Sequence, residues 1–385
     1  MMIYLDHNST SPIDPRVVET IHNTHQQGYL NPASQHREGQ RARKKLETLR
    51  QSISQLLGGE TAGMASDTLV FTSGGTESNN LALIGLASHA AKETGSGEIF
   101  VSAVEHPSII GAAEALARNG FSIRKLPVDS NGVVLLDTLQ QWVTDRKPLL
   151  VSVMLANNET GVIQPIQEIS SICRTGDVLF HTDAVQWVGK QPLHFGDLNV
   201  DALTFTAHKF QGPRGIGGLL LKHGLTADPI LFGGFQQMAV RPGTEDVALV
   251  AGMEHALRLA AMDESRASRM CQLRDRLENR LLDLFPDLVI NGRSADRLPH
   301  TSNLSFPEID RQAFLMAADM NDLAVSTGSA CASGSSEPSP VLLAMKADPD
   351  VVRGSIRISL GANTSVEEID EAILRIGRIV ENLSG

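Results

Sequence analysis

Cysteine is scarce in this chain of 385 residues, and the three that are present, Cys173, Cys271 and Cys331, lie far apart. No Cys-x-x-Cys pair occurs, so the sequence excludes a disulfide framework and a zinc site built from thiolates. No apolar run approaches the roughly 18 to 20 residues that cross a bilayer, and the mean hydropathy is −0.07. The first residues also lack the basic region and long apolar stretch of a signal peptide. We therefore expect a cytoplasmic protein without membrane contact and without a metal site.

An excess of positive charge is also missing. The chain has 33 basic and 44 acidic side chains, a net charge of −11, which makes nucleic acid and anionic membranes poor partners. Hydrophobic residues make up 42% and charged residues 20% of the sequence, close to the globular average. The length and composition are typical of two packed domains of one enzyme.

From residue 68 to residue 221, short apolar runs alternate with helical patterns. Continuous apolar strands between helices indicate a mostly parallel sheet that is covered on both faces. In such a sheet, ligands bind beyond the carboxyl ends of the strands. The predicted strands are 68–72, 99–103, 121–128, 149–155, 178–182, 202–206 and 217–221. The predicted helices are 77–91, 108–118, 135–143 and 166–173.

The C-terminal part of the chain mixes helices with short strands. A long helical stretch, 247–284, is predicted to bridge two domains, and apolar residues at spacings of three and four predict a final helix capped by Ser365. The predicted class is α/β, with a large domain over residues 14–255 and a smaller α+β domain formed by 1–13 and 256–385. The short strands of the smaller domain are expected at 288–291, 303–306 and 355–360.

A glycine-rich loop, Thr-Ser-Gly-Gly-Thr-Glu-Ser-Asn-Asn at 72–80, joins a predicted strand to a predicted helix. Its glycines, Gly75 among them, allow close approach of the backbone, and the helix N-terminus offers free amides to an anion. The loop is neither a Walker loop nor a dinucleotide fingerprint. A phosphate site and a plain turn capped by Thr76 are both compatible with this pattern.

Three polar residues follow predicted strands, where ligands of a parallel sheet bind. Lys209 precedes the glycine-rich turn at 212–218. Shielding from water lowers the pKa of a lysine, as an amine that forms a Schiff base requires, and an ordinary surface lysine is the alternative. Asp183 is placed to keep a pyridinium nitrogen protonated, or else to cap a helix. His106 is placed to stack on a flat cofactor, or else is simply packed.

The segment 326–336, Ser-Thr-Gly-Ser-Ala-Cys-Ala-Ser-Gly-Ser-Ser, carries only small side chains around Cys331. Because no aliphatic side chain larger than alanine anchors it, we expect this segment to be mobile and exposed. A thiol on such a segment suits a nucleophile that has to travel. The alternative is a flexible linker that happens to contain a cysteine.

Seven motifs, taken together and in this order, resemble one family. Over residues 3–380 the chain is similar to the cysteine desulfurases, which belong to the class V branch of the fold-type I pyridoxal-phosphate enzymes. The motifs are Tyr4-Leu5-Asp6-His7-Asn8-Ser9-Thr10, Asn31-Pro32-Ala33-Ser34, Thr76-Glu77-Ser78-Asn79-Asn80, Asn157-Asn158-Glu159-Thr160-Gly161, Asp183-Ala184-Val185-Gln186, His208-Lys209 and Gly328-Ser329-Ala330-Cys331.

The resemblance implies a homodimer with pyridoxal 5′-phosphate at the subunit interface, which converts L-cysteine to L-alanine. Lys209 would bind the cofactor covalently, His106 would stack on its ring, and Asp183 would pair with the ring nitrogen. Cys331 would take the sulfur as a persulfide for a sulfur-acceptor or iron–sulfur scaffold protein. The other implied contacts are Gln186 and Asn158 at the ring oxygen, Gly75, Thr76, Thr206, His208 and the partner's Thr244 at the phosphate, and Arg357 with Asn158 at the substrate.

One segment departs from the family's pattern. After Gly233-Gly234 the family has a third glycine and then Gln/His-Glu-Arg, whereas this chain has Phe235-Gln236-Gln237-Met238. The segment is expected near the partner's active site, so the departure bears on efficiency, substrate preference or sulfur acceptor. The rivals are another class V enzyme, such as an aminotransferase or a selenocysteine lyase, and a non-catalytic dimer that is a scaffold for iron–sulfur assembly. The travelling cysteine argues against an aminotransferase, and the retained lysine, aspartate and histidine argue against the scaffold.

Overall fold

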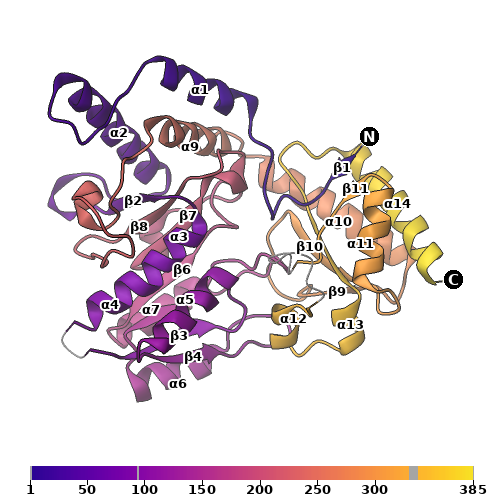
Figure 1. The fold of residues 1–385 in the computed structure, drawn as a ribbon. Coiled ribbons are helices and arrows are strands. Elements are labelled where there is room, and N and C mark those ends of the chain that lie inside the picture. Colours follow the sequence, from indigo (N-terminus) through magenta and orange to yellow (C-terminus); the bar gives the residue numbers. More distant parts are fainter. Residues whose placement is uncertain (1, 93–94, 329–336, 385) are drawn as a thin grey trace.

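The computed structural model describes residues 2–92, 95–328 and 337–384, and within these residues a seven-stranded sheet forms the centre of the larger part of the molecule (Figure 1). In spatial order its strands are β2 (Thr68–Thr72), β8 (Gly217–Leu221), β7 (Ala202–Thr206), β6 (Leu179–Asp183), β5 (Leu150–Ser152), β3 (Glu98–Ser102) and β4 (Ser122–Leu126). β8 is antiparallel to both of its neighbours, and the other pairs are parallel. The prediction of a mostly parallel sheet is confirmed.

Helices cover both faces of this sheet. Successive residues of a strand point to opposite sides, so each strand provides apolar side chains on both faces for the helices to pack against. In β3, Ile99 and Val101 enter one hydrophobic cluster, whereas Phe100 between them enters another. The first cluster includes side chains of the π-helical turn Leu81–Gly85, α4 (Leu86–Ala90) and α5 (Pro107–Arg118). The second includes side chains of α1 (Pro15–Gln26), α2 (Arg37–Leu56), α6 (Leu136–Arg146), α7 (Ile166–Thr175) and α9 (Val247–Ala261). Burial on both faces explains the apolar sequences of β7 and β8, whereas the edge strand β4 has exposed polar side chains.

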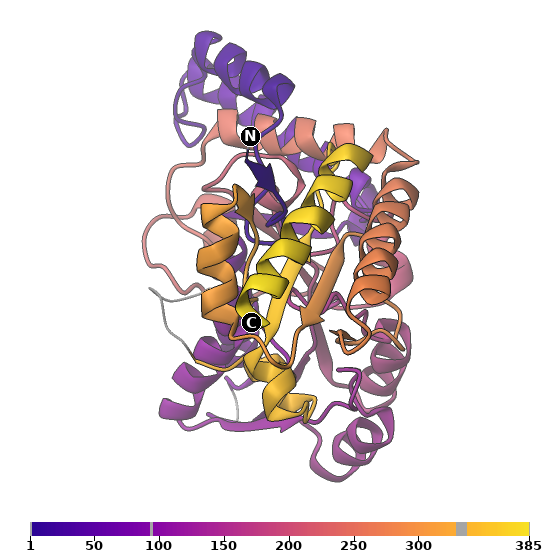
Figure 2. The ribbon, with the colours of Figure 1, turned by 90° about the vertical axis from the view of Figure 1, so that its right-hand side faces the viewer.

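A separate hydrophobic cluster fills the part of the molecule that we call the small lobe. Among the described residues, its three-stranded antiparallel sheet has the order β12 (Ser355–Ser359), β10 (Thr301–Ser305) and β9 (Val289–Ile290). The helices of the lobe are α10 (Arg266–Leu284), α11 (Arg311–Met320) and α14 (Val366–Ser384). α14 crosses the lobe diagonally, with α11 and α10 on its two sides (Figure 2). Ser365 caps α14 as predicted, because its Oγ accepts from the Glu368 N–H while the Glu368 carboxylate accepts from the Ser365 N–H.

The helical stretch predicted over 247–284 consists of two helices with a turn between them. α9 ends at Ala261 and α10 begins at Arg266, so that α9 packs against the large sheet and α10 in the small lobe. Asp263 holds the intervening turn through ion pairs to Arg269 at 2.8 Å and to Arg266 at 3.5 Å. Aspartate and serine form helices poorly, which places the break at this point.

The N-terminal segment runs from the small lobe to the large sheet. β1 (Ile3–Tyr4) pairs in parallel with β11 (Leu323–Ala324), and Asp6 bridges to Ser359. The chain then passes the residues that follow β7, where the Ser11 N–H donates to the His208 carbonyl, and enters α1. Residues 8–10 therefore lie beside the carboxyl end of β7.

Short helices complete the fold. They are α3 (Gly75–Asn80), α8 (Phe195–Leu198), α12 (Pro340–Ala344), α13 (Pro349–Arg353) and the 3₁₀ turns Gly63–Ala65, Ala207–Phe210 and Gln236–Ala239. The predicted helix over 77–91 is thus composed of α3, the π-helical turn and α4 in succession. Among the residues that the structure describes, no helix combines the length and the apolar character needed to cross a bilayer.

Candidate active site

A cavity of about 250 Å³ lies at the carboxyl ends of the parallel strands. All nine residues that the resemblance assigns to the cofactor within one subunit line it, although they come from five separate stretches of the chain. Its lining consists of Gly75, Thr76, Asn79, His106, Ser108, Met154, Ala156, Asn158, Asp183, Val185, Gln186, Thr206, His208 and Lys209. The sheet therefore gathers these side chains as its topology predicts.

Lys209 lies in the 3₁₀ turn directly after β7, and its side chain is half-buried. Its Nζ donates to the backbone carbonyl oxygens of Asn8 and Ser9, at 2.5 and 2.6 Å. The N-terminal segment thus fixes the direction of the lysine side chain. The amine is held within the cavity wall and does not extend from the surface as an ordinary loop lysine would.

Asp183 ends β6 and is buried. Its Oδ2 accepts from Asn79 Nδ2 at 2.6 Å, and its Oδ1 accepts from the Val185 N–H at 2.9 Å. Asn79 also donates to Ser108 Oγ at 2.9 Å, which ties α3 to α5 across the cavity. These donors fix the orientation of the carboxyl group.

His106 is the N-cap of α5, where its Nδ1 accepts from the Ser108 N–H at 3.1 Å. Burial lowers the pKa of His106, the charge of Lys209 acts in the same direction, and that of Asp183 opposes it. Burial, with Lys209 nearby, also lowers the pKa of His208 to about 4. At neutral pH both cavity imidazoles are therefore uncharged.

The loop after β2 and the start of α3 form one end of the cavity. α3 begins at Gly75, and no side chain caps it, so the alternative that Thr76 is the cap is wrong. A Cβ built on Gly75 would meet Val185 Cγ2 at 3.0 Å and Thr206 Cγ2 at 3.6 Å, so glycine leaves room that a side chain would take. Backbone N–H groups of a first helical turn have no partner within the helix and bind anions.

Comparison with known proteins decides the family. The family model described as aminotransferase class-V matches residues 3–372. A cysteine desulfurase IscS of Dictyoglomus turgidum is 39% identical over 99% of this chain and 95% of its own. A cysteine desulfurase of a Nostoc species is 39% identical over 99% of this chain and 94% of its own.

The chain belongs to the cysteine desulfurases of the class-V aminotransferase family. A solved structure agrees: the NifS-like protein of Rickettsia africae superposes with a TM-score of 0.88 at 33% identity, covering 99% of this chain and all of that one. The family is known to depend on pyridoxal phosphate. The resemblance predicted from the motifs is therefore confirmed, together with the fold that it implied.

Two described residues expected in a cysteine desulfurase site, Arg357 and Thr244, lie outside the cavity lining. Arg357, in β12, forms an ion pair with Asp6 at 2.7 Å and donates to the Asn158 carbonyl at 3.1 Å. Thr244 lines a different pocket, of about 390 Å³, next to α9. Cys331 lies outside the described residues, so the expected mobility of its loop stays a prediction.

Sequence reasoning for a cysteine desulfurase missed the residues behind the cavity. Asn8 links several of them: its backbone oxygen accepts from Lys209 and from Gln186 Nε2, and its Oδ1 accepts from Lys190 Nζ at 3.3 Å. Lys190 also bonds Gln186 Oε1 at 2.8 Å and His300 Nε2 at 3.0 Å. Burial pushes the pKa of Lys190 well below its usual value. The only signal for Asn8 was its place in a family motif, and Lys190 had none.

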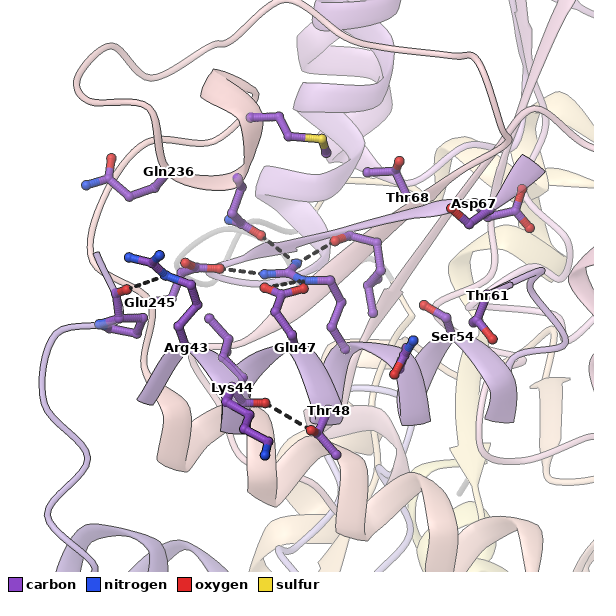
Figure 3. Close-up of a pocket in the computed structure, with 18 of the residues that line it drawn as sticks. Arg43, Lys44, Glu47, Thr48, Ser54, Thr61, Asp67, Thr68, Gln236 and Glu245 are labelled. Atoms are coloured by element: carbon purple, nitrogen blue, oxygen red, sulfur yellow. Dashed lines mark hydrogen bonds and ion pairs between the residues drawn. The ribbon is translucent and has the colours of Figure 1, made fainter. Parts of the chain in front are cut away.

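A wider pocket of about 860 Å³ adjoins the segment that departs from the cysteine desulfurase pattern (Figure 3). It lies between α2, the start of β2 and residues 235–245, and Arg50 crosses it to pair with Glu245 at 2.7 Å and Glu47 at 3.2 Å. The side chain of Gln237 pairs with the backbone of the edge strand β2. Its Oε1 accepts from the Phe71 N–H at 2.7 Å, and its Nε2 donates to the Phe71 carbonyl at 2.8 Å. These bonds hold a backbone in which residues 237–239 have positive φ values of 47°, 58° and 60°.

Proposed function

We propose that this cysteine desulfurase binds pyridoxal 5′-phosphate in the cavity around Lys209 and passes the sulfur of L-cysteine to Cys331 as a persulfide, leaving L-alanine. The observation that carries the proposal is the composition of the cavity. One amine, one buried carboxylate, an uncharged imidazole and an uncapped helix N-terminus face a single space of about 250 Å³. This set of groups matches the aldehyde, ring nitrogen, ring face and phosphate of that cofactor.

Each group of the cofactor has a proposed partner. Lys209 would bind the aldehyde, Asp183 the ring nitrogen, and His106 the face of the ring. Gln186 and Asn158 would bond the ring oxygen. The phosphate would lie against the start of α3 and three side chains, which are Thr76, Thr206 and His208. When bound, the cofactor supplies an electron-accepting ring that stabilises negative charge on the substrate's Cα.

The protein's own groups would handle the substrate. The Lys209 amine would take the proton from the Cα of L-cysteine, and the uncharged His106 would accept or return a proton nearby. Arg357 Nε is buried without a partner among the described residues, although the rest of its guanidinium is engaged. A substrate carboxylate would satisfy that donor and compete with Asp6 for Arg357.

Sulfur transfer would use Cys331 as the nucleophile. Its thiolate attacks the substrate sulfur, a sulfur–sulfur bond forms as the carbon–sulfur bond breaks, and the electron pair left on carbon takes a proton to give alanine. No external oxidant is needed, because the carbon is reduced as the sulfur is oxidised. The described cysteines suit this role poorly: burial raises the pKa of Cys173 to about 12, and burial also raises that of Cys271.

The active unit is proposed to be a homodimer. Thr244, the residue expected to reach the partner's phosphate site, lines a pocket separate from its own chain's cavity. Phe232, Phe235 and Met238 near it are 89%, 92% and 69% exposed, which is unusual for large apolar side chains and typical of an interface.

We further propose a large domain over 14–255, a small domain from the rest, a cytoplasmic location, and a sulfur-acceptor or iron–sulfur scaffold protein as the recipient.

The test is turnover of L-cysteine with a reductant, measured as alanine and sulfide, for wild type and Lys209→Ala. Wild type should form the two products in equal amounts, and Lys209→Ala should form neither. Borohydride should attach the cofactor to Lys209, and Lys222 provides an internal control. Attachment to Lys222, or a transamination product in place of alanine, would contradict the proposal.

A further inference from the structure

We infer that Glu159 is a positioning residue for sulfur transfer, because its carboxyl group joins the two described ends of the segment that bears Cys331. The inference rests on the proposed role of Cys331. Glu159 belongs to a motif that identified the family, yet only its neighbour Asn158 has an assigned role there. Its side chain is buried and lies away from the cavity lining.

The C-terminal end of the segment is fixed to Glu159 by a hydrogen bond. Ser339 Oγ donates to Glu159 Oε2 at 2.5 Å. The same hydroxyl accepts from the Leu342 N–H at 3.1 Å and thereby caps α12. A hydroxyl has one proton to donate, and Ser339 donates it to Glu159. A lone pair of the same oxygen accepts the hydrogen bond from the first turn of α12. The carboxyl group therefore sets where α12 begins.

The N-terminal end of the segment packs against the same carboxyl group. A Cβ built on Gly328 would meet Glu159 Oε2 at 3.0 Å and its Cγ at 3.2 Å, and the backbone there has φ = 84°. Gly328 is thus required both by its conformation and by its contact with Glu159. Two residues earlier, Ser326 pairs with Arg357 through two backbone hydrogen bonds, of 3.1 and 2.6 Å.

Glu159 is itself fixed relative to the cavity. Its N–H donates to Asn157 Oδ1 at 2.9 Å, and Asn157 Nδ2 donates to the Val104 carbonyl at 3.0 Å. The adjacent residue, Asn158, lines the cavity. A short and rigid path therefore connects the cavity wall to both ends of the segment.

Because the chain is covalently continuous, the anchoring of Gly328 by Glu159 restricts where the Cys331 thiol can be. Cys331 is three residues beyond Gly328 in the sequence, so the covalent chain ties the reach of its thiol to the position of Gly328. Displacing Gly328 displaces the region that the thiol is able to reach. A misplacement of about 1 Å lowers the rate of a transfer step by as much as about 100-fold. The steps at the cofactor use other residues and should not change.

The experiment separates these steps in a single turnover of the holoenzyme with L-cysteine and no reductant. It measures the visible cofactor band, the spectral change on adding L-cysteine, and the rate at which the peptide containing Cys331 gains the mass of one sulfur atom. Glu159→Ala should keep the band and the spectral change within about twofold and slow the mass gain about 10- to 100-fold. Glu159→Gln should recover part of the rate, because its amide oxygen still accepts from Ser339.

Two further variants complete the design. Ser339→Ala should slow the mass gain in the same selective way, and it keeps the test decisive if Glu159→Ala does not fold. Glu168→Ala, which removes an exposed carboxylate from α7, is the matched control and should behave as wild type. An unchanged mass gain in Glu159→Ala and Ser339→Ala overturns the inference, and so does a parallel loss of the cofactor band. Absence of sulfur on Cys331 in wild type overturns the proposed function instead.

Discussion

Glu105 is a buried acid beside the active site, and its replacement by glutamine should change how stability depends on pH. Its Oε1 accepts from Ser102 Oγ at 2.6 Å and from the Met154 N–H at 2.7 Å, while Oε2 is buried without a partner among the described residues. Burial, with a smaller contribution from the charge of Asp183, raises the pKa of Glu105 to about 8. The carboxyl group is therefore protonated at neutral pH.

The size and sign of this pH effect follow from the pKa of Glu105 in the folded and the unfolded states. In the unfolded chain this carboxyl loses its proton near pH 4.5, but the folded protein retains it up to about pH 8. Between these values the folded state binds more protons, so stability falls as pH rises. A difference of about 3.5 pKa units corresponds to an upper limit of about 5 kcal/mol lost across the window. Glutamine resembles the protonated acid and should not show this loss.

The assay is urea unfolding of wild type and Glu105→Gln from pH 5 to pH 9. Near pH 5 the two free energies of unfolding should agree within about 1 kcal/mol, whereas above pH 8 the variant should be more stable by about 3 to 5 kcal/mol. Glu168→Gln, on an exposed face of α7, should follow wild type throughout. Parallel curves for wild type and Glu105→Gln would refute the reasoning.

Three other substitutions test the surroundings of the cavity. Asp183→Asn should bind the cofactor yet turn over L-cysteine at least about 100-fold more slowly, since shape is kept and charge is lost; near-normal turnover would contradict its role. Lys190→Met should lower the free energy of unfolding by about 1 to 3 kcal/mol in urea titrations, because Gln186 Oε1 loses its donor, and no change would show that the bond is unimportant. Gln237→Ala should release the segment held on Phe71 and weaken dimerisation in sedimentation experiments, whereas an unchanged dimer would separate this segment from the interface.

Local sequence patterns predict much of the fold. Apolar runs between helical patterns predicted β2, β7 and β8 with their observed bounds, because each strand is buried on both faces. The break between α9 and α10 was missed, since both sides keep a helical pattern and the two helices pack in different hydrophobic clusters. Periodicity reports helical character but not which core a helix joins.

The candidate site was predictable where residues follow strands and not where distant segments meet. Asp183, His106 and Lys209 lie at or directly after strand ends, so the sheet's topology predicted their convergence. Asn8 and His300 are bonded across 292 residues, and no local pattern reports such a contact. A lysine such as Lys190, in a turn between two elements, is expected to be solvated although the structure buries it.

The most direct test of the account is the location of the transferred sulfur. Wild type treated with L-cysteine and no reductant should gain the mass of one sulfur atom on the peptide containing Cys331. Cys331→Ser should still show the spectral change on adding L-cysteine but release neither alanine nor sulfide. Sulfur found on Cys173 or Cys271, or full activity in Cys331→Ser, would contradict the account.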